Sequence, residues 1–403
     1  MIEIKGGVTA PKGFFASGIH CGLKREKKDL AFIYSDVMCS GAAVYTRNLV
    51  KGEPIYVTQE HLKDGQAQAI IINSGNANTC TGQKGRQNAF KMARGLAKEI
   101  GANKEDIIVA STGVIGVQLP VEKIEAAIPE LVSRASKEGH IDASEAILTT
   151  DLSNKEIALS IEIEGKEVTL GGMAKGSGMI EPNMATMLSF ITTDINIDQD
   201  LLKEALGTTV DKSYNRISVD GDTSTNDMVS ILANGKAGNA KITSKDENYD
   251  KFVKALQHIN IYLAKEIARD GEGATKLVEC FVKGAKSEED AEKLSKSVIA
   301  SSLVKTAMFG ADANWGRILC ALGYAGVEVD LKQINIDIES KSGLITVYKD
   351  GKGADFDEDL AKKILDAKEI RIIVNLNSGS CEATAWGCDL SYDYVKINGA
   401  YRT

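Results

Sequence analysis

The sequence predicts an α/β or α+β fold in which helices cover β-sheets. Short apolar runs alternate along the chain with segments that are apolar on one helical face only, a pattern typical of strands and amphipathic helices packed in layers. The chain has 403 residues, of which 43% are apolar. That is enough for one large core or for roughly two to three domains. The C-terminal part is richer in strand patterns than the rest.

Two buried strands with a helix between them are the first elements expected. Residues 70–72 and 107–110 are apolar runs bounded by polar and glycine-rich turns, which is typical of strands covered on both faces. Between them, apolar residues recur at helical spacing as far as Gly101, which predicts one amphipathic helix that ends there. Pro120 suits the first turn of a helix and predicts that a second helix begins at that point.

The middle of the chain is expected to hold a hairpin, a buried strand and long helices. Apolar and polar residues alternate on both sides of residues 164–166, which predicts a β-hairpin. Residues 187–191 are an apolar run directly after a glycine-rich loop, and we expect them to form a buried strand. Helical patterns follow near residues 198–207, 249–268 and 288–307.

Strand patterns dominate the end of the chain. They cover residues 334–338, 344–348 and 370–376. We place a soft boundary near residue 280, ahead of an acidic stretch that begins a helix. Residues 281–403 would then form a smaller C-terminal α+β domain.

Charge and cysteine content argue against several classes of protein. The chain carries 48 basic and 56 acidic side chains, a net charge of -8, and no Lys/Arg-rich block, which argues against nucleic acid or an anionic membrane as a partner. Its seven cysteines include no C-x-x-C pair, so we expect neither a disulfide framework nor a zinc site. The N-terminus lacks the pattern of a secretory signal, and no apolar stretch approaches the about 18 residues of a membrane span. Reduced thiols in the cytoplasm fit this composition best.

Residues 174–190 combine the features of a reactive segment. A glycine-rich stretch leads to Pro182, and Ala185 and Thr186 stand directly before the apolar run. If the peptide bond between Ala185 and Thr186 were cut, Thr186 would gain a free α-amine beside its own hydroxyl. An α-amine has a pKa of about 7.7–8.0, so it could act as the base that activates this threonine. A threonine that merely begins a strand fits the same pattern, so both interpretations stay open.

A second candidate lies at residues 109–116, where a strand runs into a glycine-bearing turn. Backbone N–H groups in such a turn, helped by the hydroxyl of Thr112, could converge on a developing oxyanion. A plain strand-to-loop turn is the alternative. Residues 220–227 are rich in oxygen atoms, but they lack the glycine and closing glutamate of an EF-hand, so we expect turn hydrogen bonds there and no metal.

Several separated segments together resemble the ornithine acetyltransferase family, also called glutamate N-acetyltransferase or ArgJ. The resemblance extends over essentially the whole chain. It rests on residues 6–14, 73–78, 111–116, 149–151, 175–190, 218–227, 310–317 and 397–403.

The resemblance implies transfer of an acetyl group from N2-acetyl-L-ornithine to L-glutamate in arginine biosynthesis, and some members of the family also use acetyl-CoA. It implies self-cleavage between Ala185 and Thr186, giving an α chain (1–185) and a β chain (186–403) that assemble as a heterotetramer of two α and two β chains. The implied fold is an α/β/β/α-type sandwich with a smaller C-terminal α+β domain, without a metal or bound cofactor. The runner-up is an N-terminal-nucleophile aminopeptidase or amidase, which uses water as the acceptor. A binding protein that only retains the fold is a third interpretation.

The resemblance also implies roles for particular residues. Thr186 matches the nucleophile, and Thr112 and Gly113 match the oxyanion pair. Substrate contacts are implied for Thr149, Lys175, Thr186, Glu272, Asn398 and Thr403. From the signs of their charges, we expect Lys175 to bind a carboxylate and Glu272 an ammonium group, although solvated surface charge is the ordinary alternative. A tail that reaches the substrate must be tied down, because chain ends are otherwise poorly ordered.

Overall fold

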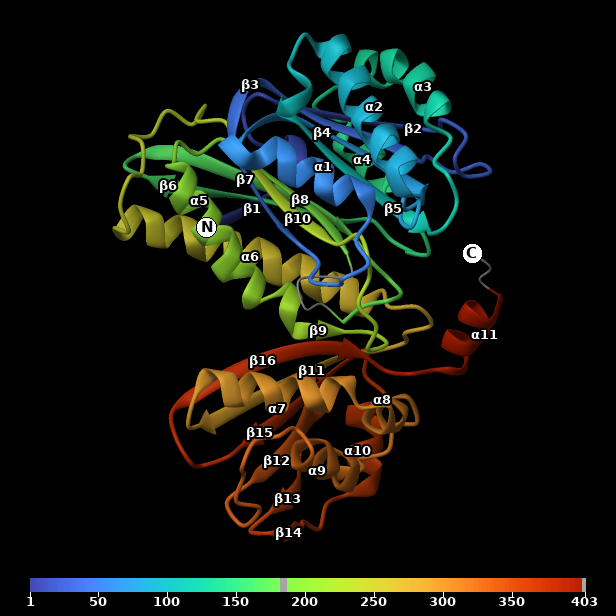
Figure 1. Cartoon of the computed structure of the whole chain (residues 1–403). Helices are drawn as coiled ribbons and strands as arrows, with labels where there is room; N and C mark the ends of the chain where they lie inside the picture. The colour runs from blue at the N-terminus through green and yellow to red at the C-terminus, as the bar shows by residue number, and fades with distance from the viewer. Residues whose placement is uncertain (182–186, 401–403) are drawn as a thin grey trace.

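The computed structural model describes residues 1–181 and 187–400, and in that part of the chain it shows two β-sheets with helices packed against them (Figure 1). The first sheet consists of β1 (Ile2–Ile4), β2 (Phe14–Ile19), β3 (Leu30–Tyr45), β4 (Gln66–Asn76), β5 (Ile107–Val114), β6 (Lys155–Ile163), β7 (Lys166–Lys175), β8 (Leu188–Thr193) and β10 (Met228–Ala233). Its helices are α1 (Glu53–His61), α2 (Gly82–Ile100), α3 (Val121–Ser133), α4 (His140–Ala146), α5 (Gln199–Asp211) and α6 (Glu247–Arg269).

Strand β3 is long and belongs to both layers of the first sheet. Residues 30–34 of β3 pair with β4 and residues 40–45 pair with β10, and the register shifts between these two parts. Side chains on the inner faces of both halves form one core cluster, which includes Ile70 from β4 and Phe190 from β8. The outer faces pack against α2 and α3 on one side and against α5 and α6 on the other. The expected α/β/β/α layering is therefore confirmed, with the two layers belonging to one bent sheet.

The strands that follow residue 186 lie between strands that precede it. The order in the second layer is β6, β7, β8, β10 and then β3. Strand β8 pairs with β7 on one side and with β10 on the other, and β10 pairs with β3. Segments from both halves of the sequence thus share one hydrogen-bonded ladder at the centre of the sheet.

Local sequence signals explain several element ends. Helix α2 ends at Gly101, which is left-handed with φ 73° and whose N–H reaches the carbonyl of Ala97. The β6–β7 hairpin turns at Glu164 and Gly165, both with positive φ. The prediction of a single helix near residues 288–307 was wrong in one respect, because two helices, α7 (Glu288–Ala300) and α8 (Ser302–Phe309), occupy that segment. Ser301 separates them, and its hydroxyl accepts a hydrogen bond from the N–H of Val304 to cap the second.

The second sheet has the order β14-β13-β12-β15-β11-β16-β9 and an aliphatic core. Its strands are β9 (Ile217–Ser218), β11 (Leu277–Ala285), β12 (Asn335–Ser340), β13 (Gly343–Lys349), β14 (Lys352–Gly353), β15 (Glu369–Asn375) and β16 (Cys381–Cys388). The helices that follow β11 are α7 (Glu288–Ala300), α8 (Ser302–Phe309), α9 (Trp315–Gly323), α10 (Glu358–Leu365) and α11 (Tyr392–Ala400). Residue 280, our expected boundary, lies inside β11. We call the first sheet with α1 to α6 the first body, and the second sheet with α7 to α10 the second body. Helix α11 follows β16 and lies to one side of the two bodies (Figure 1). In the described ranges, no helix is long and apolar enough to cross a membrane.

Candidate active site

A cavity of about 240 Å³ lies where the ends of β5, β7, β8 and β10 meet α11. The predicted site residues within the described ranges all line it. They are Thr112, Gly113, Thr149, Lys175, Glu272 and Asn398. The remaining predicted residues, Ala185, Thr186 and Thr403, lie outside the described residues. Met187, which follows Thr186 directly in the sequence, also lines the cavity.

One wall of the cavity is the last part of β5, which carries Thr112 and Gly113. Gly113 has φ 133°, and a Cβ there would lie 2.3 Å from the carbonyl carbon of Gly75, so both backbone and space require glycine. The side chain of Asn226 donates hydrogen bonds to the carbonyl of Ser111 at 3.0 Å and to that of Ala77 at 2.6 Å. Asn226 thereby holds the last part of β5 from the side of β10.

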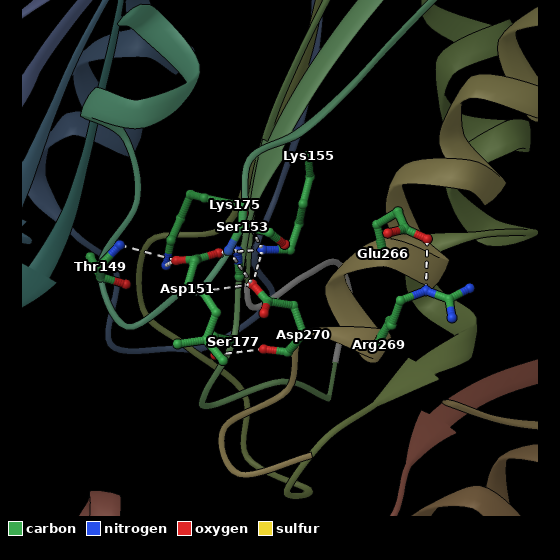
Figure 2. A network of polar contacts seen from close by, with 11 residues as sticks. Thr149, Asp151, Ser153, Lys155, Lys175, Ser177, Glu266, Arg269 and Asp270 are labelled. Carbon is green, nitrogen blue, oxygen red and sulfur yellow. Dashed lines mark hydrogen bonds and ion pairs between the residues drawn. The ribbon is translucent and has the colours of Figure 1, made fainter. Parts of the chain in front are cut away.

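Lys175 enters the cavity from the end of β7 and is buried, with 7% of its surface exposed. Its Nζ lies 3.9 Å from Oδ2 of Asp151, the nearest carboxylate among the described residues (Figure 2). Burial lowers the pKa of Lys175, and the charge of Asp151 opposes this shift. For Asp151, which is an acid, burial acts in the opposite direction and would raise the pKa. The positive charges of Lys175 and Lys155 outweigh this effect and hold the pKa of Asp151 well below its usual range. The cavity therefore contains a lysine whose ammonium form is only loosely paired with a carboxylate.

Asp227 is a buried carboxyl group that sequence analysis placed only in a polar turn. It precedes β10, and because β10 runs parallel to β8 with Met228 opposite Leu188, Asp227 lies beside Met187. It is 2% exposed, and within the described part of the chain its buried Oδ2 atom has no hydrogen-bond partner. Burial raises the pKa of Asp227 well above its usual value. A run of Ser, Thr, Asn and Asp immediately before an apolar strand was the only sequence signal for it.

The opposite wall joins Glu272 to the C-terminal helix α11. Asn398 donates a hydrogen bond from Nδ2 to Oε2 of Glu272 at 2.8 Å. The hydroxyl of Tyr394 reaches Oδ2 of Asp220 at 3.3 Å, and the Ser391 hydroxyl donates to the carbonyl of Gly273. These contacts tie α11 and the residue before it to the loops that follow α6 and β9, as a tail that reaches a substrate requires.

Within residues 1–181 and 187–400, no group of three or more His, Cys, Asp or Glu side chains is arranged to hold a metal ion. The polar groups that converge on the cavity are hydroxyl, amide, ammonium and carboxyl groups, which suit proton transfer and the binding of charged organic molecules.

Comparison with known proteins identifies the family. The ArgJ family model matches residues 15–403. The chain belongs to the ArgJ family. The arginine biosynthesis bifunctional protein ArgJ of Caldanaerobacter subterraneus subsp. tengcongensis is 52% identical over 400 residues, with 99% of each chain covered. The protein of the same name from Thermotoga neapolitana is 50% identical over 395 residues, covering 98% of this chain and 99% of its own.

A crystal structure gives a further match. It is that of the arginine biosynthesis bifunctional protein ArgJ from Bacillus halodurans, which is 50% identical with a TM-score of 0.51 and covers 54% of this chain and 100% of its own. The resemblance drawn from the sequence motifs is thus confirmed. The ArgJ chain described here is an acetyltransferase of arginine biosynthesis.

Proposed function

We propose that this ArgJ chain transfers the acetyl group of N2-acetyl-L-ornithine to L-glutamate, producing L-ornithine and N-acetyl-L-glutamate. The observation that carries the proposal is the cavity itself. It gathers Thr112, Lys175 and Glu272, among others, from segments far apart in the sequence of an ArgJ family member. Each of the predicted contact residues within the described ranges lines the same space.

The charges of the cavity suit both substrates. Acetylornithine and glutamate each carry an α-carboxylate, for which the loosely paired ammonium of Lys175 is a fitting partner. Ornithine also carries a side-chain ammonium, for which Glu272 offers a carboxylate held by Asn398. A cation and an anion on different walls of one cavity would orient the substrate between them.

The proposed reaction has two steps and needs no metal or bound cofactor. The hydroxyl of Thr186 loses its proton to the α-amine of the same residue and attacks the acetamide carbon, and the hydroxyl of Thr112 and the N–H of Gly113 stabilise the oxyanion. The C–N bond breaks, the leaving α-nitrogen of ornithine takes up the proton, and an acetyl ester of Thr186 remains. The α-amine of glutamate then attacks that ester and releases the threonine hydroxyl.

The free α-amine of Thr186 would arise by self-cleavage after Ala185. Residues 186–403 make up about 54% of the sequence, the share that the Bacillus halodurans ArgJ chain matches while being covered completely. That coverage is what a separate β chain would give, and it supports cleavage at this point. We further propose that two α and two β chains associate. The word bifunctional in the names of the relatives supports acetyl-CoA as a second acetyl donor.

An acceptor assay tests the transfer. Acetylornithine labelled in its acetyl group is incubated with enzyme and glutamate, and we expect labelled N-acetylglutamate with little free acetate. Acetate release that does not depend on glutamate would contradict the transferase and favour the amidase. Repeating the assay with labelled acetyl-CoA tests the second donor separately.

Intact mass spectrometry tests the cleavage. We expect two chains from the wild type, the second beginning at Thr186. A Thr186→Ala variant should remain a single inactive chain, whereas Thr186→Ser, which keeps a hydroxyl, should still be cut. A Thr186→Ala protein that is processed and active would refute the assignment of the nucleophile.

A further inference from the structure

A buried network of ion pairs lies behind the cavity and is centred on Lys155 (Figure 2). The ammonium of Lys155 lies 2.8 Å from Oδ1 of Asp151 and 2.6 Å from Oδ2 of Asp270. The side chain of Lys155 is 1% exposed, that of Asp151 0% and that of Asp270 9%. Lys155 does not line the cavity. A fully buried lysine is costly unless it is paired, so this one calls for a physical explanation.

Each partner of Lys155 holds the backbone of a segment that supplies a cavity residue. The carboxylate of Asp151 accepts hydrogen bonds from the N–H of Thr149 at 3.0 Å and from the N–H of Gly176, next to Lys175, at 2.7 Å. Asp270 lies two residues before Glu272, and its carboxylate accepts the N–H of Leu152 at 3.0 Å.

A further chain of hydrogen bonds closes the network. The hydroxyl of Ser177 donates to the carbonyl of Asp270 at 2.8 Å, and the N–H of Glu272 donates to the carbonyl of Ser177 at 2.9 Å. Three segments that carry Thr149, Lys175 and Glu272 are thus joined at the same point. One ammonium group links the two carboxylates on which this junction depends.

Lys155 also affects how strongly Asp151 can attract Lys175. Oδ1 of Asp151 accepts from Lys155 and Gly176, while Lys175 stays 3.9 Å from Oδ2. Without Lys155, the cluster would hold two carboxylates and one ammonium, and Asp151 would draw Lys175 away from the cavity. Asp270 follows the last residue of α6, where the helix dipole disfavours a carboxylate, and Lys155 offsets this too.

We propose that Lys155 is a positioning residue of the acetyltransferase site: paired with Asp151 and Asp270, it holds Thr149, Lys175 and Glu272 around the cavity and keeps the Lys175 ammonium available for a substrate carboxylate. This inference rests on the proposed function. It goes beyond it by giving a task to a side chain that does not line the cavity. Since Lys155 precedes the proposed cleavage point and Asp270 follows it, the pair also joins the two chains at the site.

The test compares three variants in the acceptor assay. Lys155→Met keeps much of the side-chain volume and removes the charge. We expect KM to rise about 10- to 100-fold for acetylornithine and for glutamate, because both bind through a carboxylate and one charged hydrogen bond is worth about that factor. We expect kcat per active site, titrated from the first turnover, to stay within a few fold. Asp270→Asn, which keeps an acceptor for Leu152, should raise both KM values less.

Lys236→Met is the matched control. Lys236 pairs with Asp36 across the same proposed cleavage point, but both side chains are more than a third exposed and neither lines the cavity. Its KM values should equal those of the wild type.

The outcomes separate the two proposals. Wild-type KM values in folded Lys155→Met and Asp270→Asn would overturn the positioning role and leave the proposed function standing. A smaller fraction of active enzyme or a lower kcat, with KM unchanged, would also overturn it, because that is what a merely structural role predicts. If Lys155→Met does not fold, Asp270→Asn decides. A wild-type enzyme that does not transfer acetyl groups to glutamate would overturn the proposed function and this inference with it.

Discussion

The two bodies of the molecule bury different kinds of side chain. Around the cavity of the first body, buried residues include Asn73, Ser111, Lys175, Asn226 and Asp227. Between residues 277 and 388, which hold most of the second sheet, the buried polar side chains are Ser295 and Lys305. The core there consists mainly of Ile, Val, Leu and Ala, with Cys280, Met308 and Tyr348.

This difference in buried polar side chains indicates which body holds the reactive site and which contributes only stability. A buried polar group costs free energy unless it is hydrogen-bonded, so a fold that only needs stability has no reason to accumulate such groups. The first body does so along the ends of four strands, where, among the described residues, Oδ2 of Asp227 has no hydrogen-bond partner. The second body keeps its charged pairs, such as Arg371 with Glu279 and Glu339, on an outer face. We infer that the first body performs the reaction and the second supports it.

The largest effect is expected for Thr112→Val in the first body. The substitution keeps the shape of the side chain and removes the hydroxyl proposed to stabilise the oxyanion. We expect kcat to fall about 10²–10³-fold, the typical loss for one such donor, with KM little changed. Steady-state kinetics of the acceptor assay measure this. A kcat within a few fold of the wild type would remove Thr112 from the chemistry and weaken the contrast between the bodies.

Ile372→Ala makes the corresponding change in the second body. Ile372 lies on β15 and is fully buried in the aliphatic core. We expect the free energy of unfolding to fall by about 2–5 kcal/mol, because the substitution removes buried methyl groups and leaves a cavity. Urea unfolding measures it, in a Thr186→Ala background so that one polypeptide is followed. At temperatures where the protein stays folded, the cleaved Ile372→Ala enzyme should keep wild-type kcat and KM, and a changed KM would show that the bodies are coupled.

Asp227→Asn should change how stability depends on pH. Burial raises the pKa of Asp227 in the folded chain, so the folded state binds this proton more tightly than the unfolded state does. Its contribution is fully present below the ordinary pKa of an aspartate and is lost as pH rises through the raised pKa. The Asn variant lacks that loss, so its stability relative to the parent should increase as pH rises. Urea unfolding at pH 5 and pH 8, again with Thr186→Ala in both proteins, measures the difference, and a gap that stays constant would contradict it.

The smallest effect is expected for Glu339→Gln. Glu339 pairs with Arg371 at 3.8 Å on the exposed face of the second sheet. Exposed ion pairs contribute about 0–1 kcal/mol, so urea unfolding should give a value close to that of the wild type. A larger loss would mean that charges on this face do more than keep the second body in solution.

Features that depend on residues close together in the sequence could be predicted from it. Helix α2 follows from apolar residues at helical spacing and from Gly101, and the β6–β7 hairpin from alternation around residues 164–166. The family motifs pointed to Thr112, Lys175 and Glu272, which the fold brings to one cavity.

What local patterns could not predict depends on contacts between distant segments. The two roles of β3 follow from pairing with β4 and with β10. The pair of Lys155 with Asp270 spans 115 residues, and isolated lysines and aspartates in a sequence are normally exposed. The burial of Asp227 could not be predicted for the same reason. An aspartate in a polar turn is normally exposed, and only the pairing of the following strand, β10, with β8 places this one in the interior.

The interleaved order of β7, β8, β10 and β3 has a consequence for how the protein must be made. If the chain is cut after residue 185, β7 and β3 belong to one fragment, and β8 and β10, which pair with them, belong to the other. Fragments produced separately would therefore expose unpaired strand edges and tend to aggregate. The intact polypeptide would have to fold before it is cut, and afterwards the two products could part only by unfolding together.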